Sequence, residues 1–347
     1  HPLLPPSAPS GQNGDMLRGA VFGFGNMGQQ FTRFVNENDA IEARIVAATN
    51  RGADKLAIAR EEYGLAASHH IEDVLGMDLD FVLIGSTSIA HADQVVAAAE
   101  AGCHIFCEKP IGLTLGEADR MIDAVKRAGV ITVVNYISRF NKAYRKVHEL
   151  LNAGELGRPL SIGHSRLRGY GLYAAGARHR AVLEPEESGG WAVHHACHDT
   201  DLGYWLGGPV SEVWGRTGTT VPDSDSEELV TGLLAFESGA TGFVEDSVCA
   251  LREHYTRVIG EKGSLVLTGE HESTLFRLKR EGSETEERLD IQDRKRKGNG
   301  LDHFFACLAS GTDSPHSMEE ARHSLEIAVA LQRSARLGKP VTLPLNE

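Results

Sequence analysis

The sequence predicts an α/β protein in which an amino-terminal doubly wound parallel sheet precedes an α+β domain with a large, mostly antiparallel sheet. Three observations carry this prediction. Apolar strands alternate with amphipathic helices from Met16 to about residue 138. A glycine-rich turn follows the first strand. Beyond about residue 140, strand-like runs separated by turns replace this alternation, which is typical of an antiparallel meander.

The first domain is expected over residues 16–138. Strands that alternate with helices of about ten residues or more indicate a parallel sheet with helices on both faces. The expected strands are 17–25, 43–50, 80–86, 103–110 and 130–136, and the expected helices are 26–38, 55–65, 91–102 and 115–129.

The second domain is expected over residues 139–347 and begins with a helix over 142–154. Residues 281–300 are highly charged and are expected to form an exposed loop, and a closing helix over 317–338 is expected to pack back towards the first domain. The expected strands lie within 160–171, 210–218, 227–239, 240–250, 255–269 and 273–280.

Composition excludes several classes of partner. The 347 residues suffice for two cores, and 35 Lys and Arg face 48 Asp and Glu, which gives a formal net charge of -13. Phosphate contacts need a basic surface, so neither nucleic acid nor an anionic membrane is expected as the main partner. No apolar run approaches the roughly 18–20 residues of a membrane helix.

The leader and the cysteines point to a reducing compartment. Residues 1–15 are rich in Pro, Ser and Gly and lack the features of a signal peptide, so a flexible leader is expected there. The five cysteines are irregularly spaced and do not suggest a disulfide framework. Cys103 and Cys107 are expected to be buried free thiols. We therefore expect a cytoplasmic protein.

The turn from Gly23 to Gly28 has the pattern G-x-G-x-x-G, which is weak by itself but here links a strand to a helix. Gly23 permits the tight turn, Gly25 lets a pyrophosphate approach the backbone, and Gly28 allows close packing of helix on strand. The amino end of the helix offers N–H groups to the phosphates. We therefore expect a dinucleotide cofactor.

The end of the second strand bears on the choice of cofactor. An acid there usually binds the ribose 2′-hydroxyl of NAD, but the sequence has Thr49, Asn50 and Arg51. Without a carboxylate to repel a 2′-phosphate, and with an arginine to bind one, the cofactor is NAD or NADP, with a slight preference for NADP. Alternatively, Arg51 points to solvent.

Lys109 ends the fourth expected strand, within the tripeptide Glu108-Lys109-Pro110. Ligands of open parallel sheets bind at the carboxyl ends of the strands, so Lys109 can reach a substrate oxygen there. Pro110 restricts the local backbone. The alternative is an ordinary ion pair at a surface turn.

Several stretches together resemble the Gfo/Idh/MocA family of NAD(P)-dependent sugar and cyclitol oxidoreductases. The resemblance covers nearly all of the chain after Met16 and depends on the combination, since EKP alone is not specific. The stretches are the glycine turn, VLIGSTSIAH (82–91), EAGCHIFCEKP (100–110), VVNYISRF (133–140), LLNAGELGRP (150–159), the glycine pair 189–190 and SARLGKPVTLP (334–344).

The resemblance implies a Rossmann domain, an active site in the cleft between the two domains, and Lys109 as the catalytic lysine. The family's second motif is an Asp followed, after three residues, by a His at the start of a helix. Aligned on the glycine pair, that His is His198, whereas the Asp position holds His194 and departs from the family pattern. The expected cofactor-binding residues are Gly23, Phe24, Gly25, Asn26, Met27, Asn50, Arg51, Ser86, His91, Glu108, Lys109 and Asn135.

Helical spacing predicts that His194, His198 and Asp201 share one helix face. His198 is the expected base, because a neutral imidazole can take the hydroxyl proton as hydride leaves the carbon. His194 is expected to contact the same substrate, and Asp201 to fix a tautomer or to support packing. His195 and Asp199 fall off this face and are expected to be structural. No metal is expected, although His194, His198 and Asp201 could alternatively bind zinc or another divalent ion.

A cluster of basic residues precedes the histidines and comprises Arg166, Arg168, Arg178, His179 and Arg180. If it lines the pocket, the substrate carries an anion such as a carboxylate. The alternative is pairing with Glu184, Glu186 and Glu187 or with a neighbouring subunit. The expected substrate-binding residues are Arg139, Arg166, Arg168, Trp191, His194, His195 and His198, and the expected catalytic residues are Lys109, His194 and His198.

The resemblance thus implies hydride transfer between nicotinamide and a secondary alcohol carbon of a sugar, a sugar derivative or a cyclitol, in a homodimer or homotetramer. One alternative is an NAD-dependent glycoside hydrolase that oxidises its substrate transiently without net redox change. Another is a nucleotide-binding regulator without enzymatic activity.

Overall fold

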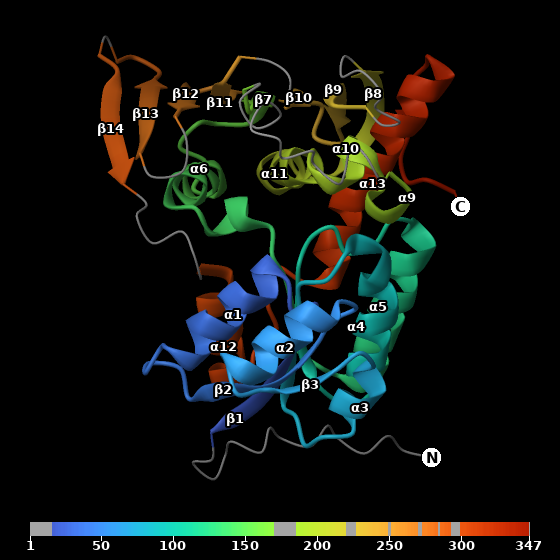
Figure 1. Ribbon diagram of the computed structural model, residues 1–347. Coiled ribbons are helices and arrows are strands. Elements are labelled where there is room, and N and C mark those ends of the chain that lie inside the picture. The colour runs from blue at the N-terminus through green and yellow to red at the C-terminus, as the bar shows by residue number, and fades with distance from the viewer. Residues whose placement is uncertain are drawn as a thin grey trace, which may run out of the picture. The chain divides into compact units, whose positions relative to one another are not determined.

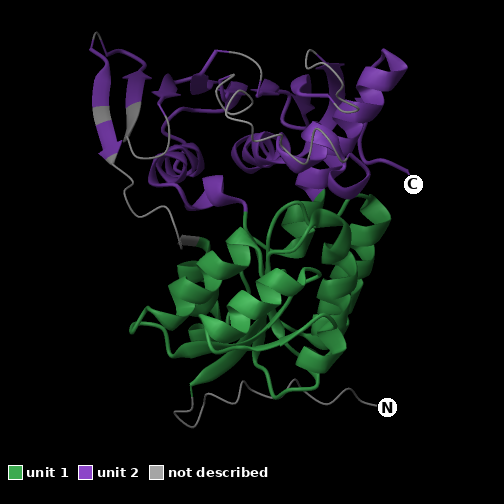
Figure 2. Cartoon of the chain, viewed as in Figure 1, with its two compact units in different colours: residues 1–135, 300–322 green, residues 136–299, 323–347 purple. Residues whose placement is uncertain are grey.

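The computed structural model describes residues 16–169, 185–219, 227–248, 251–269, 273–283, 285–292 and 299–346. The chain divides into two compact units (Figure 2). Unit 1 comprises residues 1–135 and 300–322, and unit 2 comprises residues 136–299 and 323–347. No helix among the described residues is long and apolar enough to cross a membrane.

Unit 1 contains a six-stranded parallel sheet with the strand order β3-β2-β1-β4-β5-β6. Figure 1 labels the first three of these strands, β3, β2 and β1. Its middle strands are continuous apolar runs, as expected where helices cover both faces of a parallel sheet. The strands are β1 (Leu17–Phe22), β2 (Ala43–Thr49), β3 (Ala66–Ser68), β4 (Phe81–Ile84), β5 (His104–Cys107) and β6 (Thr132–Val134).

The helices of unit 1 carry clear local signals. In α5 a capping box joins Thr114 to Glu117, and Gly129 ends the helix in the left-handed conformation with φ 66°. Phe304 and Phe305 of the carboxy-terminal helix α12 lie edge-on to Phe81 and so complete the aromatic core. The helices are α1 (Asn26–Asn36), α2 (Ala53–Glu61), α3 (Ile71–Leu75), the 3-10 turn η2 (Ser88–Ala90), α4 (His91–Glu100), α5 (Leu115–Ala128) and α12 (Asn299–Ser310).

Unit 2 contains a nine-stranded sheet with the order β14-β13-β12-β11-β7-β10-β9-β8-β15. The described pairings are antiparallel except between β7 and β10, which run parallel in the middle of the sheet. The strands are β7 (Pro159–Leu167), β8 (Val210–Gly218), β9 (Leu229–Phe236), β10 (Thr241–Ser247), β11 (Glu253–Gly260), β12 (Gly263–Thr268), β13 (Ser273–Arg280), β14 (Glu287–Gln292) and β15 (Val341–Thr342).

The helices of unit 2 include α6 and α11, which lie on one side of this sheet (Figure 1). Helix α11 packs on β7 and β10. The opposite face carries Trp214 and Leu233, which are exposed and face each other across β8 and β9. The helices are the 3-10 turn η3 (Ile137–Phe140), α6 (Lys142–Asn152), α9 (Pro185–Ser188), α10 (Gly190–His194), α11 (Cys197–Gly207) and α13 (Met318–Leu337), whose first residues belong to unit 1.

The predicted fold class is confirmed: a parallel sheet in the amino-terminal part and a mostly antiparallel sheet after it. The elements that were not predicted include β3, α3 and α12. Strand β3 and helix α3 are too short to show a periodicity, and α12 is apolar on most sides and lacks a clear amphipathic pattern. The expected loop over 281–300 is wrong in part, because β14 lies within it and pairs with β13.

The cysteine expectation is confirmed for the described residues, in which Cys103, Cys107, Cys197 and Cys307 are free and buried. Burial raises the pKa of the Cys103 thiol to about 11, and it also raises the pKa of Cys107. Both therefore remain neutral, unreactive thiols.

Candidate active site

The glycine turn of unit 1 is held against the neighbouring strands. The N–H groups of Gly23 and Phe24 both donate to the carbonyl oxygen of Thr49, at 3.0 and 2.9 Å. Gly23 has φ +86°, and a Cβ there would collide with the backbone of Ser86. Only glycine satisfies both conditions. Phe24 is fully buried and lies edge-on to Tyr63, so the packing of its side chain in the core holds the turn in place.

The turn leaves room where a phosphate would bind. Gly25 precedes α1, and a Cβ on it would meet no atom within 4 Å, so the backbone is open to an approaching ligand. A Cβ on Gly28 would collide with the carbonyl of Gly23, so this glycine serves packing. The first turn of α1 carries no acidic residue, and Asn26 and Met27 are exposed. These features fit the pyrophosphate of a dinucleotide.

A carboxylate that sequence reasoning overlooked lies beside the turn after β2. Asn50 accepts a hydrogen bond from the N–H of Gly52 at 2.8 Å, and Arg51 is exposed. Asp54, in the first turn of α2, points back to this turn: a Cβ on Gly52 would lie 2.6 Å from its Oδ1. The strand end itself has no carboxylate, as expected, but the Asp54 carboxylate lies beside the turn that follows it. Asp54 escaped notice because it lies inside the next helix, outside the strand end.

His91 and Ser86 tie two loops together. Nδ1 of the buried His91 lies 2.7 Å from the carbonyl oxygen of Pro110, and Nε2 lies 3.3 Å from that of Ser86. Burial lowers the pKa of His91, so the neutral ring donates through Nδ1 to the closer carbonyl. The Ser86 hydroxyl donates to Gln94 at 2.7 Å. Through its contact with Pro110, His91 fixes the loop that follows Lys109. The cofactor contacts expected of Ser86 and His91 stay predictions.

Lys109 follows β5 and is half-buried. Beside it, the Glu108 carboxylate accepts a hydrogen bond from the Asn135 amide at 2.6 Å. Burial raises the pKa of Glu108, which the bond from Asn135 opposes. Because β5 and β6 are neighbours, this contact joins their carboxyl ends and fixes the backbone that carries Lys109.

The predicted single helix face of His194, His198 and Asp201 is wrong, because the helix is interrupted. His194 ends α10, His195 and Ala196 form a turn, and α11 begins at Cys197. His198 lies in the first turn of α11, is 6% exposed, and lies edge-on to Tyr136 at 6.0 Å between ring centroids. His194 is half-buried and lies edge-on to His195.

Asp201 binds Arg139, in agreement with the second of its two expected roles, support of packing. The guanidinium donates through Nε and Nη2 to both carboxylate oxygens, at 2.8 to 3.1 Å, and Ser324 donates at 2.7 Å. Arg139 is 2% exposed and Asp201 is fully buried. Arg139 therefore anchors α11 to η3, and its predicted substrate contact lacks geometric support.

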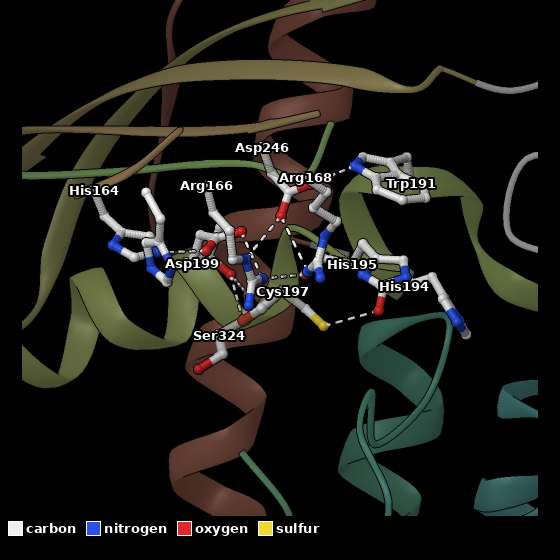
Figure 3. A network of polar contacts seen from close by, with 12 residues as sticks. His164, Arg166, Arg168, Trp191, His194, His195, Cys197, Asp199, Asp246 and Ser324 are labelled. Carbon is white, nitrogen blue, oxygen red and sulfur yellow. Dashed lines mark hydrogen bonds and ion pairs between the residues drawn. The ribbon is translucent and has the colours of Figure 1, made fainter. Parts of the chain in front are cut away.

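A second buried ion network surrounds Arg166 (Figure 3). Its guanidinium donates to Asp199 at 2.9 Å, to Asp246 at 3.1 Å and to the carbonyl oxygen of His195 at 3.2 Å. Burial disfavours the cation, but the two carboxylates outweigh burial and raise the pKa of Arg166. Arg166 is 5% exposed and its charge is compensated, so it follows the alternative of ion pairing, with aspartates as its partners.

Asp246 connects this network to α10. It accepts a hydrogen bond from the indole of Trp191 at 2.6 Å and lies 3.5 Å from Arg168. Burial raises the pKa of Asp246 to about 6. Trp191 is fully buried and stacks on His195, so it supports the turn before α11 and offers no surface to a substrate. Burial and the neighbouring Arg166 lower the pKa of Arg168.

His164 completes the network and was missed from the sequence. Its Nε2 lies 2.8 Å from Asp199 and its Nδ1 lies 2.7 Å from the Thr256 hydroxyl. Burial lowers its pKa to about 3, so the ring is neutral, and its one hydrogen bond among the described residues joins Nδ1 to the Thr256 hydroxyl. One signal was present: His164 and Arg166 occupy inward positions of β7, and Arg166 faces Asp246 in register across β10.

Two further expectations concern metal and charge. Among the described residues, no group of three His, Cys, Asp or Glu side chains is arranged to hold a metal ion. The alternative zinc site also loses Asp201 to Arg139. Four members of the charged cluster and its expected partners lie outside the described residues: Arg178, His179, Arg180 and Glu184. The two described arginines of the cluster, Arg166 and Arg168, pair with aspartates rather than with Glu186 or Glu187.

Unit 1 defines a Rossmann dinucleotide-binding domain, to which the chain joins an α+β domain with a buried histidine at the start of a helix. A family model described as an oxidoreductase family with an NAD-binding Rossmann fold matches residues 17–136, and the GFO/IDH/MocA C-terminal domain matches residues 144–266. The protein belongs to the Gfo/Idh/MocA family of NAD(P)-dependent oxidoreductases.

Individual relatives differ in what their names state. The scyllo-inositol 2-dehydrogenase (NAD(+)) of Bacillus subtilis is 31% identical over 77% of this chain and 79% of its own length. The 2,7-anhydro-N-acetylneuraminate hydratase of Escherichia coli is 27% identical over 85% of this chain and 80% of its own. A levoglucosan dehydrogenase structure has a TM-score of 0.84, covers 95% of this chain and 100% of its own, and at 21% identity shows the shared fold.

Proposed function

We propose that this oxidoreductase transfers hydride between a nicotinamide cofactor and a secondary alcohol carbon of a sugar, a sugar derivative or a cyclitol. The observation that carries the proposal is the glycine turn, open above Gly25, in a chain whose 31% identical relative is an inositol dehydrogenase. We place the protein in the cytoplasm, where its buried free thiols would stay reduced.

The proposed chemistry divides between two side chains. A bound nicotinamide supplies the hydride acceptor or donor. Lys109 donates a hydrogen bond to the reacting oxygen and stabilises negative charge that develops on it. His198 takes the hydroxyl proton during oxidation and returns it during reduction. His194 binds a neighbouring hydroxyl of the substrate. Lys109 belongs to unit 1 and His198 to unit 2.

The finer choice of cofactor is part of the proposal. We propose that the site accepts both NAD and NADP and slightly prefers NADP, because Arg51 is exposed at the end of β2 and can pair with a 2′-phosphate. The Asp54 carboxylate limits this preference by repelling the phosphate and by offering an acceptor to a 2′-hydroxyl.

The substrate site is proposed around His194, His195 and His198. The anionic substrate suggested by the arginines loses the support of Arg166, which two carboxylates neutralise. Arg168 keeps one contact, at 3.5 Å to Asp246, and its side chain is 17% exposed. A carboxylate-bearing sugar therefore remains within the proposed substrate class through Arg168.

We also propose a homodimer or homotetramer formed through the outer face of the unit 2 sheet. Trp214 and Leu233 are 37% and 54% exposed and lie opposite each other in register on that face. Burial of such an apolar pair is favourable. Size-exclusion chromatography with light scattering should show an oligomer that Trp214→Glu dissociates. A wild-type monomer at micromolar concentration would contradict this part.

The test of the proposed function is a spectrophotometric screen at 340 nm, an absorbance that only the reduced cofactor has. NAD and NADP are tested against matched sugars, uronates, cyclitols and their glycosides. Reduction of cofactor by at least one sugar or cyclitol, lost in Lys109→Ala, supports the proposal. Failure of every polyol to reduce either cofactor, with cofactor binding intact, contradicts it.

A second candidate is favoured by the relative named a hydratase, because addition of water involves no net redox change. In this alternative the cofactor is reduced and reoxidised within one turnover while a glycosidic or anhydro bond is cleaved. A chromogenic glycoside would then release its aglycone with a catalytic amount of cofactor and without accumulation of the reduced form. The same screen distinguishes the two candidates.

A further inference from the structure

We propose that His69, at the end of β3, contacts the 2′ position of the adenosine ribose and helps to discriminate NAD from NADP. This inference rests on the proposed function, because it assumes that the cofactor binds at the glycine turn. His69 was not among the residues expected from the sequence. It follows a three-residue strand that has no periodic signal of its own.

The position of His69 follows from the strand order β3-β2-β1. Two N–H groups of the glycine turn donate to the carbonyl oxygen of Thr49, which joins the expected phosphate position to the end of β2. The next residue, Asn50, presents its carbonyl oxygen to Nδ1 of His69 at 3.0 Å. The ribose of a dinucleotide lies at the end of β2. His69 borders that position on the side away from the phosphates.

The hydrogen bond to Asn50 determines how the imidazole presents itself. A carbonyl oxygen can only accept, so Nδ1 carries the proton. In the neutral ring Nε2 is then an acceptor, which suits the 2′-hydroxyl of NAD and opposes a phosphate oxygen. A proton on Nε2 turns it into a charged donor, which suits the 2′-phosphate of NADP. The ring is exposed, so a ligand can reach it.

Charged groups on every neighbouring element influence this choice. The turn after β2 contributes Arg51, and α2 contributes the carboxylate of Asp54. On the β3 side the Asp73 carboxylate accepts from the Ser68 hydroxyl, which in turn accepts from the N–H of His70; Glu72 lies beside Asp73 in α3. Helix α2 also contributes two cations, Lys55, which lies 3.6 Å from Asp54, and Arg60, which donates to the carbonyl oxygen of Ala67 in β3. A positive charge on the His69 ring would move this balance towards the 2′-phosphate.

The experiment uses ligands that lack nicotinamide, so that catalysis plays no part. ADP-ribose and 2′-phospho-ADP-ribose are titrated into the full chain by calorimetry at about pH 8 and about pH 6. The wild type should shift its affinity ratio towards the phosphorylated ligand by about fivefold at the lower pH, the size of one charge-assisted hydrogen bond at an exposed site. His69→Gln, which cannot gain the charge, should lack this shift.

Two variants serve as controls. His70→Gln removes the adjacent exposed imidazole and should keep the wild-type shift, because the contact with the Asn50 carbonyl is made by His69. Arg51→Gln should weaken the phosphorylated ligand at both pH values and keep the shift. The second ionisation of the phosphate, near pH 6, is common to all proteins and cancels between them.

Each outcome bears on one proposal. A wild-type shift that survives in His69→Gln and in a second variant, His69→Asn, overturns the role of His69, as does an equal loss in His70→Gln. A wild type whose ratio is independent of pH overturns it as well. Binding of neither ligand to the wild type contradicts the cofactor site itself, and hence the proposed function.

Discussion

The Arg166 guanidinium and the Asp199 carboxylate form a buried ion pair, with Nη2 2.9 Å from Oδ2. Arg166 is 5% exposed and Asp199 is fully buried. The same guanidinium group holds the carbonyl of His195, so one side chain of the sheet fixes both the end of α10 and the start of α11. His198 immediately precedes Asp199, so its position depends on this pair.

Asp199→Asn should therefore destabilise the fold and misplace His198. Removing one partner of a buried pair leaves an uncompensated charge and costs about 3–5 kcal/mol in the free energy of unfolding. Denaturant titration measures this cost. Arg168→Lys is the matched control, because Arg168 makes one long contact with Asp246, and should cost less than about 1 kcal/mol. Equal losses in the two variants would refute the assignment.

Two glycines of the nucleotide turn should respond differently to a methyl group. The new methyl group of Gly25→Ala meets no atom within 4 Å, so the free energy of unfolding should change by less than about 1 kcal/mol. Cofactor affinity should fall about tenfold or more, because the methyl group occupies the proposed phosphate position. Gly28→Ala collides with the carbonyl of Gly23 and should lower stability by about 1–3 kcal/mol. Calorimetric cofactor titration and thermal melting separate the two effects; an unchanged affinity in Gly25→Ala would place the phosphates elsewhere.

Replacing either of the two proposed catalytic side chains should lower kcat. Lys109→Met and His198→Asn are each expected to lower kcat about 10²- to 10⁴-fold, the range of positioned acid–base groups, with cofactor Kd nearly unchanged. His194→Asn should act mainly on the KM of the substrate, because its proposed role is binding. The control is Cys103→Ser. Cys103 is a buried thiol directly before β5, whereas Lys109 follows the other end of this strand. A kcat loss below about tenfold in His198→Asn would exclude it as the base.

The stability of the network should depend on pH in opposite senses at two residues. Burial lowers the pKa of His164 to about 3, so below pH 6.5 the unfolded chain takes up a proton that the folded chain refuses, and stability falls as pH decreases towards 3. The pKa of Asp246 is raised to about 6, so its contribution is full below pH 3.8 and is lost as pH rises through 6.

His164→Gln removes the first dependence and keeps the second. The difference in unfolding free energy between wild type and variant should therefore decrease by about 1.4 kcal/mol per pH unit as pH is lowered from about 6 to about 4. Denaturant titrations at several pH values measure this slope. A slope indistinguishable from zero would mean that His164 is protonated alike in the folded and unfolded chains.

Much of the nucleotide-binding half could be predicted from the sequence. Strands such as β1 and β4 are apolar runs followed by amphipathic helices, and the glycines of the turn sit at spacings that the backbone geometry demands. Lys109 was also predictable, because a parallel sheet always brings the carboxyl ends of its strands to one edge. These are consequences of local periodicity and of a general rule of topology.

The tertiary structure alone decided which charges are free. Arg139 and Asp201 are 62 positions apart, and Arg166 and Asp246 are 80 apart, yet each pair is buried in direct contact. The interruption between α10 and α11 likewise depends on Arg166, which reaches the His195 carbonyl from the sheet. Local spacing therefore predicted one helical face for His194, His198 and Asp201, whereas the folded chain buries Asp201 against Arg139. Periodicity is a property of neighbouring residues, whereas the compensation of a buried charge depends on partners that only the folded chain brings within hydrogen-bonding distance.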